Sequence, residues 1–240
     1  MGLVGRRIIM NKKPFFEHFK ELNIRIIASL IVVIFFSVII YINYSTIYNF
    51  LVTPLLNAGY SNADLVAFTI YEGFQVKISN TFLVALVLSL PILIILIGNF
   101  IKPAINNLTN FSYIMYIFSF LSLFYFGVFA AYQTLPIAID FLLSFNVSDF
   151  ILRTQNYFQI IFRIALLFGI SFQIPLVIYF LLKKRIISIS IFTENRKEIF
   201  VIVLIFSAVL TPTGDPLTLF AFAIPIYLLI EFVLFLNRNK

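Results

Sequence analysis

The feature that most constrains the fold is a run of residues without charge. Between Lys77 and Lys102 the chain carries twenty-four uncharged residues, 78–101. A helix of that length reaches ~36 Å, which is enough to cross a hydrocarbon core of ~30 Å. The whole chain is 62% hydrophobic and 11% charged, with a mean hydropathy of +1.05. This balance excludes a soluble domain and a disordered chain, because too few polar side chains are available to cover a soluble surface.

Further apolar runs predict an all-α polytopic membrane protein built as a single domain, 1–240. Helices are expected because a helix satisfies its own backbone hydrogen bonds in lipid. An N-terminal segment, 1–23, precedes the first span. The six expected spans are 24–42, 78–101, 113–139, 157–182, 199–210 and 217–236.

The distribution of Lys and Arg predicts the orientation. With the N-terminus inside, three basic residues lie outside, namely Lys77, Arg153 and Arg163. The positive-inside rule therefore favours an N-in, C-in topology with an even number of spans. The fourteen basic residues on the inner side are Arg6, Arg7, Lys12, Lys13, Lys20, Arg25, Lys102, Lys183, Lys184, Arg185, Arg196, Lys197, Arg238 and Lys240.

The last two spans are expected to be short. Residues 199–210 are uncharged over only twelve positions, or ~18 Å of helix. After the turn "LTPTGDP", the apolar run 217–230 meets Glu231. Short helices thin the bilayer locally, and prolines inside spans bend them, so we expect a concave, glove-like wall. The prolines are Pro91, Pro136, Pro175 and Pro225; the residues of the final turn are Thr211, Pro212, Asp215 and Pro216.

The outer loop 43–77 is long and half apolar. Pro54 and Gly59 are expected to break it into short helices on the outer membrane face.

Enzymatic chemistry is not indicated by the sequence. His18 is the only histidine and cysteine is absent, so we expect no catalytic residues, no metal site and no cofactor. The chain has a net charge of +7, and most of its basic residues flank hydrophobic segments. This distribution is typical of residues that determine membrane topology and does not indicate nucleic-acid binding.

Two of the polar residues within spans are candidates for a functional role. Gln173 precedes Pro175 by two residues, and two interpretations stay open for it. It forms an interhelical hydrogen bond that also serves a carbonyl freed by the proline, or it is a docking point for a partner's transmembrane helix. Arg163 either lines a pathway or extends towards the outer interface.

The segment "PFFEHFKELNIR" places Glu17 and Glu21 four residues apart on one helical face. These carboxylates either face solvent or bind a basic peptide through charge-assisted hydrogen bonds.

Five short motifs follow one another along the chain between Pro14 and Glu231. They are His18, Glu21, Leu22 and Arg25; Glu72, Phe74 and Lys77; Pro91, Phe100, Ile101 and Pro103; "FGISFQIP", 168–175; and Thr211, Pro212, Asp215 and Pro216. Together and in this order they resemble the TatC family, the multispanning receptor of the twin-arginine protein translocase.

The resemblance implies a function. Such proteins bind twin-arginine signal peptides of folded precursors at the inner face and recruit single-span TatA-like subunits. The resemblance also implies a homo- or hetero-oligomer, and translocation that the proton-motive force drives. By position, Glu21 would contact the arginine pair, Phe100 would belong to the inner binding surface, and Gln173 would face partner helices.

The chain also departs from the family pattern. Thr109 stands where a second glutamate is usual, Asn23 replaces an arginine, and Leu96 and Gly98 replace a glutamine and a tryptophan. We therefore expect weakened or altered twin-arginine selectivity, with Glu17 offsetting the missing acid.

Two alternative functions are a membrane subunit of a respiratory or proton-translocating complex and a small-molecule transporter. No titratable group is central enough for a proton relay, and no inverted repeat is visible. The abundance of Phe, Ile, Asn, Lys and Tyr indicates an AT-rich genome. We therefore expect the mitochondrial inner membrane, with the plastid thylakoid membrane or a bacterial plasma membrane as alternatives.

Overall fold

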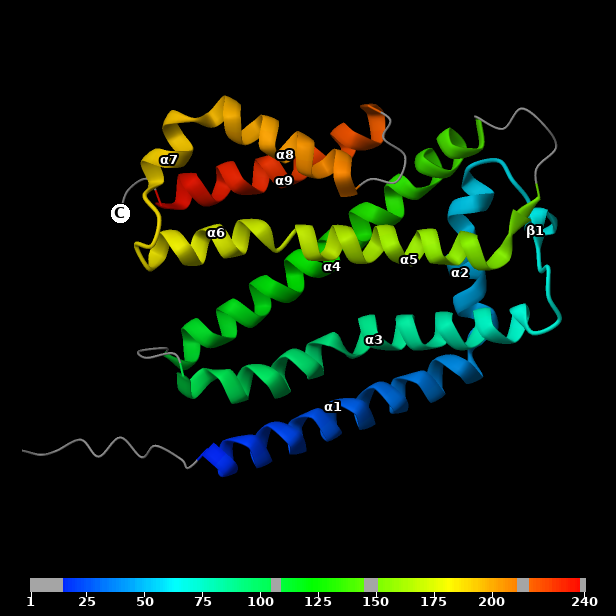
Figure 1. Cartoon of the computed structure of the whole chain (residues 1–240), viewed down its shortest axis with the longest axis horizontal. Coiled ribbons are helices and arrows are strands. Elements are labelled where there is room, and N and C mark those ends of the chain that lie inside the picture. Colours follow the sequence, from blue (N-terminus) through cyan, green and yellow to red (C-terminus); the bar gives the residue numbers. More distant parts are fainter. Residues whose placement is uncertain (1–14, 105–108, 145–150, 211–215, 238–240) are drawn as a thin grey trace, which may run out of the picture.

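The computed structural model describes residues 15–104, 109–144, 151–210 and 216–237, and it is almost entirely helical. Figure 1 shows the helices laid out in one slab. The elements are α1 (Phe15–Ile42), α2 (Tyr44–Asn57), η1 (Asn62–Asp64), β1 (Leu65–Val66), α3 (Glu72–Ile101), η2 (Lys102–Ala104), α4 (Asn110–Ser144), β2 (Leu152–Arg153), α5 (Thr154–Ser171), α6 (Ile174–Lys183), α7 (Ile189–Glu194), α8 (Arg196–Leu210) and α9 (Pro216–Asn237).

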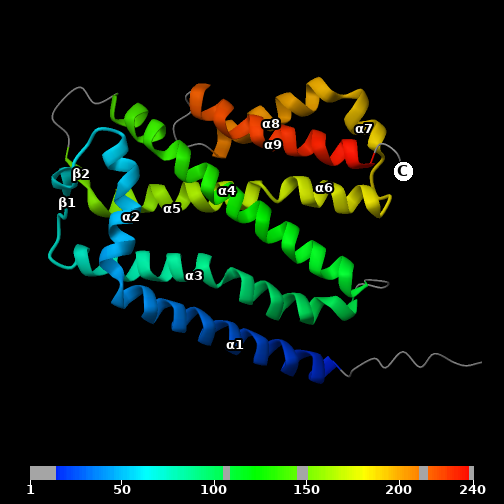
Figure 2. The same cartoon turned by 180° about the vertical axis from the view of Figure 1, so that it is seen from behind.

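The long helices run between two ends of the slab. At one end α1 begins, α3 ends, α4 begins and α6 ends (Figure 1); we call it the basic end. The strand end carries α2, β1 and the start of α5 (Figures 1 and 2). Helix α1 packs on α3, α5 packs on α4, and α9 packs on both α6 and α8. The basic residues of the described helices and turns at the basic end are Lys20, Arg25, Lys102, Lys183, Lys184, Arg185, Arg196 and Lys197.

Within the described ranges, five helical stretches are long and apolar enough to cross a membrane. They are Phe19–Ile42, Glu72–Ile101, Asn110–Ser144, Thr154–Lys183 and Thr218–Asn237. The protein is therefore a multi-pass integral membrane protein. Helix α8 has 15 residues, a length of about 23 Å, and is shorter than these five.

The expectation that both final helices are short is correct for α8 and wrong for α9. Helix α9 has 22 residues, a length of about 33 Å. Its ends lie within one residue of the expected span 217–236, and the helix continues past Glu231 because this carboxylate has partners. Tyr227 donates to Glu231 at 2.9 Å, and the Arg196 guanidinium lies 3.5 Å from it.

The prediction that Pro54 breaks the first loop is also wrong. Helix α2 runs through Pro54, which is buried, and ends at Asn57. A proline removes the N–H that would bond the carbonyl four residues earlier. Here that carbonyl, on Phe50, accepts a hydrogen bond of 2.8 Å from the Tyr132 hydroxyl instead. The chain turns after α2 at Gly59, where φ is +89°.

The prolines of the spans have unequal effects on their helices. Helices α3, α4 and α9 are continuous through Pro91, Pro136 and Pro225. Only at Pro175 is a span interrupted, where Phe172 and Gln173 separate α5 from α6. A concave wall built by proline kinks therefore stays a prediction.

The strand end holds the one departure from an all-α fold among the described residues. Strands β1 and β2 pair in parallel, with Leu65 opposite Leu152 and Val66 opposite Arg153. Glu72, at the start of α3, is completely buried beneath this pair. Its carboxylate accepts from Arg153 Nε at 3.2 Å, from the Phe68 N–H at 3.0 Å and from the Gln155 N–H at 3.2 Å. These bonds fix the loop because a buried carboxylate requires such partners.

Candidate functional site

The first turns of α1 carry the candidate acid at the basic end. Arg25 donates to Glu21 Oε1 at 2.6 Å, and the two residues of this ion pair lie one helical turn apart on α1. The second guanidinium nitrogen of Arg25 donates to the Leu96 carbonyl of α3 at 2.6 Å. Arg25 thus holds the carboxylate of Glu21 in place and ties α1 to α3. Both side chains are partly exposed, 29% for Glu21 and 22% for Arg25, so an approaching ligand can reach the pair.

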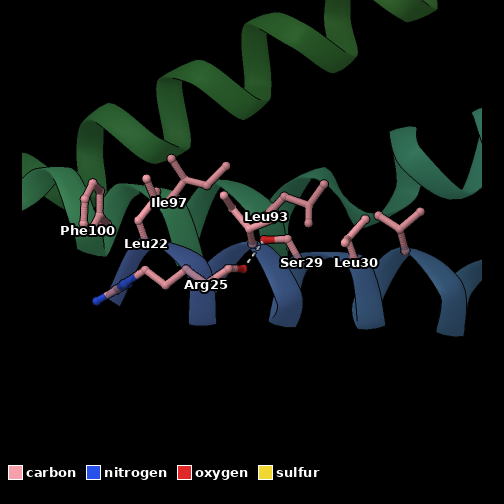
Figure 3. Close-up of a pocket in the computed structure, with 9 residues that line it drawn as sticks. Leu22, Arg25, Ser29, Leu30, Leu93, Ile97 and Phe100 are labelled. Atoms are coloured by element: carbon pink, nitrogen blue, oxygen red, sulfur yellow. Dashed lines mark hydrogen bonds between the residues drawn. The ribbon is translucent and has the colours of Figure 1, made fainter. Parts of the chain in front are cut away.

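An apolar groove runs from this ion pair along the interface of α1 and α3. Its volume is about 230 Å³. Figure 3 shows Arg25 and Phe100 near one end of the groove and Leu30 towards the other. The Arg25 guanidinium lies 5.9 Å from the centre of the Phe100 ring, within the range of a cation–π contact. The lining residues are Leu22, Arg25, Ile26, Ser29, Leu30, Val33, Leu93, Ile97 and Phe100.

Thr109 is exposed at the start of α4, where it caps the helix. Its Oγ1 accepts from the Ser112 N–H at 3.2 Å and donates to the Ser112 hydroxyl at 3.0 Å. A threonine at this position satisfies a helix terminus but supplies no negative charge.

The start of α4 is tied to the end of α3 by two side-chain bonds. Lys102 donates to Asn110 at 2.7 Å, and Tyr113 donates to Asn99 at 2.9 Å. The Tyr113 hydroxyl occupies the space a Cβ at Gly98 would need, since the two would be 2.6 Å apart. Gly98 thus permits this close approach of α3 and α4.

Some expected site residues fall outside what the structure describes. Glu17 lies on α1, one turn before Glu21, but its side chain is not among the described ones. Thr211, Pro212 and Asp215 of the final turn also lie outside the described residues, whereas Pro216 is the first residue of α9.

Gln173 lies where α5 ends, inside the membrane-spanning stretch. Its Nε2 donates to the Phe120 carbonyl of α4 at 3.3 Å and to the Gly169 carbonyl at 3.2 Å. The Gly169 carbonyl is available for this bond because the backbone N–H of Gln173 donates to the Ile170 carbonyl instead. The interhelical hydrogen bond is therefore present, but the second bond goes to Gly169 and not to the Ser171 carbonyl, which is the one four residues before Pro175. Oε1 of Gln173 is buried without a hydrogen-bond partner.

Across the described ranges, no three His, Asp or Glu side chains come close enough together to hold a metal ion.

The order of these elements and the residues at the basic end can be compared with known proteins. A family model described as "Sec-independent protein translocase protein (TatC)" matches residues 17–225. The chain belongs to the TatC family. The match spans the Glu21–Arg25 pair, the groove and Gln173, so these features lie within the family's shared region. The chain is accordingly a subunit of the Sec-independent, twin-arginine protein translocase, and the respiratory and transporter alternatives are set aside.

Individual TatC proteins agree with the family match. The chain is 30% identical to the TatC of Rickettsia prowazekii over 230 residues, 92% of this chain and 91% of that one. It is 28% identical to the TatC of Magnetococcus marinus, covering 96% and 86% of the two chains. A crystal structure of the twin-arginine translocase receptor TatC superposes with a TM-score of 0.70 and 27% identity, covering 92% of this chain and 99% of that one.

Sequence reasoning missed the partners of two residues that it had named. Glu72 was noted as part of a motif and Arg153 as an outer charge, but not as an ion pair. An acid immediately before an apolar span is a usable signal, because it needs a cation once the helix end is buried. The Glu21–Arg25 pair was missed as well: Arg25 was named for topology and for the family resemblance, although its spacing of four from Glu21 is that of an ion pair on a helix.

Proposed function

We propose that the basic end of this TatC protein is the receptor surface for twin-arginine signal peptides. The observation that carries the proposal is the pairing of Glu21 with Arg25 at the mouth of the α1–α3 groove. The carboxylate already binds one guanidinium, so its surroundings suit a second one from a signal peptide. Phe100 adds an aromatic face beside it, and the groove offers room for an apolar side chain next to the arginines.

Thr109 is the part of this receptor surface where we expect weak binding of the arginine pair, because it carries no carboxylate. It lies at the start of α4, close in sequence to Asn110, which Lys102 binds. Without a carboxylate there, the arginine pair would depend on Glu21, supplemented by Glu17. We infer that selectivity for arginine over lysine is lower than with two fixed acids.

The basic end would face the inner side of the membrane, with both termini inside. The concentration of Lys and Arg at this end, against Lys77 and Arg153 at the strand end, supports that orientation. Helix α8 would then be the fifth of six crossings. At about 23 Å, it would thin the bilayer locally or lie against partners.

The translocase role implies partners and an energised membrane. We infer that single-span TatA-like subunits join the complex and that the proton-motive force drives transport. Gln173 is the proposed contact for a partner helix, since this polar residue lies within the span and is only partly covered by the rest of the chain. Residue usage favours the mitochondrial inner membrane, while the relatives named above are bacterial and favour a plasma membrane.

Site-specific photo-crosslinking tests the receptor role. Photoreactive residues at positions 21 and 109 are probed in membranes with a precursor that carries a twin-arginine signal and with its twin-lysine counterpart. Arginine-dependent crosslinks at position 21, with few at position 109, are expected. Equal crosslinking of both precursors at position 21, or none, would contradict the proposal.

A further inference from the structure

A polar cavity of about 450 Å³ opens at the strand end, where α1 ends and α2 and α3 begin (Figures 1 and 2). It is lined by Tyr41 and Ile42 of α1, by residues of the first two turns of α2, and by Lys77 of α3. None of the lining residues is acidic. We call it the Lys77 cavity, and it lies at the opposite end of the slab from the groove beside Glu21.

Lys77 supplies the charge of this cavity. Its Nζ lies 4.0 Å from the centre of the Tyr41 ring and 5.4 Å from the centre of the Tyr44 ring, within the range of cation–π contacts. Within the described ranges, no ion pair joins Lys77 to a carboxylate. The two rings therefore position the ammonium group but leave its charge without a counter-ion.

Basic residues are few towards the strand end, which makes Lys77 informative. Arg153 is paired with the buried carboxylate of Glu72, and Arg163 lies further along α5, inside the span. The positive-inside rule does not account for a basic residue on the side of the membrane where such residues are sparse. An anion that binds beside Lys77 accounts for it.

The neutral groups of the cavity are hydrogen-bond donors. Ser45 and Asn49 lie one turn apart on α2, and both are exposed to an approaching ligand. The Tyr44 hydroxyl accepts from the Asn80 amide at 3.3 Å, so its own proton can point to a ligand. Burial raises the pKa of Tyr44 and of Tyr48, so both hydroxyls stay protonated at neutral pH. A cation surrounded by hydroxyl and amide donors suits a phosphate group.

The surface next to the cavity favours a lipid over a free phosphate ion. Ile42, at the rim, is 75% exposed, and Phe35 and Val38 are exposed at spacings of three and four residues before it. Such spacings place these side chains on one face of α1, which leads from the cavity into the span. A choline or ethanolamine headgroup would bring a second cation next to Lys77, so an anionic headgroup is favoured.

We propose that the Lys77 cavity binds the phosphate group of an anionic phospholipid in the leaflet at the strand end. Lys77 pairs with the phosphate, Ser45 and Asn49 donate to the headgroup, and the acyl chains lie along the apolar face of α1. Because three helices line the cavity, the bound lipid holds the end of α1 against α2 and α3. This inference does not depend on the receptor role of Glu21.

Quenching by brominated lipids tests the site. The chain has no tryptophan, so Val38→Trp gives a single fluorescent reporter one turn from Ile42. The full chain is placed in phosphatidylcholine nanodiscs in which a fraction of the lipid is either brominated phosphatidylglycerol or brominated phosphatidylcholine. We expect phosphatidylglycerol to bind next to the reporter roughly fivefold more strongly than phosphatidylcholine.

Variants of the cation and of the reporter provide the controls. Lys77→Gln should abolish the preference, and Lys77→Arg should retain it. Lys197→Gln removes the same charge from an exposed position at the basic end and should leave the preference unchanged. Ile170→Trp, a reporter at an exposed position in the middle of another span, should show no preference. An unchanged thermal transition of each variant, followed by circular dichroism, establishes that the fold is intact.

Three results would overturn the inference. The first is equal quenching of the Val38→Trp reporter by the two lipids. The second is a preference that survives Lys77→Gln or appears equally at Ile170→Trp, which would assign it to the whole membrane surface. The third is loss of the preference in millimolar inorganic phosphate but not in chloride of the same ionic strength, which would assign the cavity to a free phosphate ion. Crosslinking at Glu21 is unaffected by any of these results, so the receptor proposal stands or falls separately.

Discussion

The hydroxyl of Tyr125 on α4 donates a hydrogen bond of 2.8 Å to the carbonyl of Val87 on α3. That carbonyl is the one that Pro91, four residues later, leaves without its helical partner. One side chain thus replaces the bond that the proline removed. Tyr132, two turns along α4, does the same for Phe50 and Pro54 of α2. The two tyrosines join α4 to α2 and α3 where those helices would be weakest.

The first prediction is that Tyr125→Phe lowers the free energy of unfolding by about 1–2 kcal/mol, because it leaves the Val87 carbonyl unsatisfied in a membrane. Unfolding of the detergent-solubilised protein is followed by circular dichroism, since the chain has no tryptophan.

The control for this prediction restores the backbone donor. In a Pro91→Ala background, the alanine N–H can bond the Val87 carbonyl, so Tyr125→Phe should cost much less than in the wild type. The same cost in both backgrounds would show that the hydroxyl stabilises the protein in some other way.

The second prediction concerns two glycines, Gly127 and Gly169, at which α4 and α5 pack closely. A Cβ at Gly127 would lie 2.8 Å from the Phe168 backbone oxygen, and one at Gly169 would lie 2.7 Å from the Phe124 ring. We expect Gly127→Ala to destabilise by about 1–3 kcal/mol, because a backbone atom must move. Gly169→Ala should cost less, because an aromatic side chain can shift more easily than backbone.

Gly73→Ala is the matched control for the glycine pair. A Cβ at Gly73 meets no atom within 4 Å, and the residue is helical. This variant should be neutral or stabilise by about 0.5 kcal/mol. If it lowers the unfolding temperature as much as Gly127→Ala does, steric contact is not the cause.

The third prediction concerns the buried carboxylate of the strand end. Glu72→Gln removes the charge that Arg153 pairs with at 3.2 Å and weakens the bonds from the Phe68 and Gln155 N–H groups. The loop around β1 should open more often, and proteolysis within it should become roughly tenfold faster. Asp64→Asn, at an exposed position of the same loop, serves as control. Equal cleavage of both variants would contradict a locking role for Glu72.

The fourth prediction concerns Gln173 within its span. Gln173→Leu removes the donor to the Phe120 and Gly169 carbonyls, so we expect a loss of about 1–3 kcal/mol in unfolding free energy. If Gln173 also meets a partner helix, co-purification of single-span subunits should fall further than with Gly169→Ala, which disturbs the same helix. Unchanged stability would show that the two hydrogen bonds contribute nothing.

The helices were the predictable part of this protein. Uncharged runs such as 78–101 lie inside helices of the structure, because composition alone requires burial in lipid. The continuity of α2 through Pro54 could not be predicted, since the compensating hydroxyl comes from Tyr132, which is distant in sequence. The ends of α9 were predicted to within one residue, but its description as short was wrong, because 22 residues of helix extend about 33 Å.

The candidate site was predicted only in outline. Glu21 and Phe100 were named from a resemblance, but their connection runs through Arg25 and its bond to the Leu96 carbonyl, which depends on how α1 packs on α3.

The most direct test of the receptor role is the affinity of a twin-arginine signal peptide for the full chain in lipid nanodiscs. Wild type, Glu21→Gln and Glu17→Gln are compared, each with the twin-arginine peptide and with its twin-lysine counterpart. The account predicts that Glu21→Gln weakens twin-arginine binding about tenfold or more, beyond the effect of Glu17→Gln, and removes the preference over twin-lysine. Equal affinity of all three proteins for both peptides would contradict the assignment of Glu21 as the arginine-binding residue.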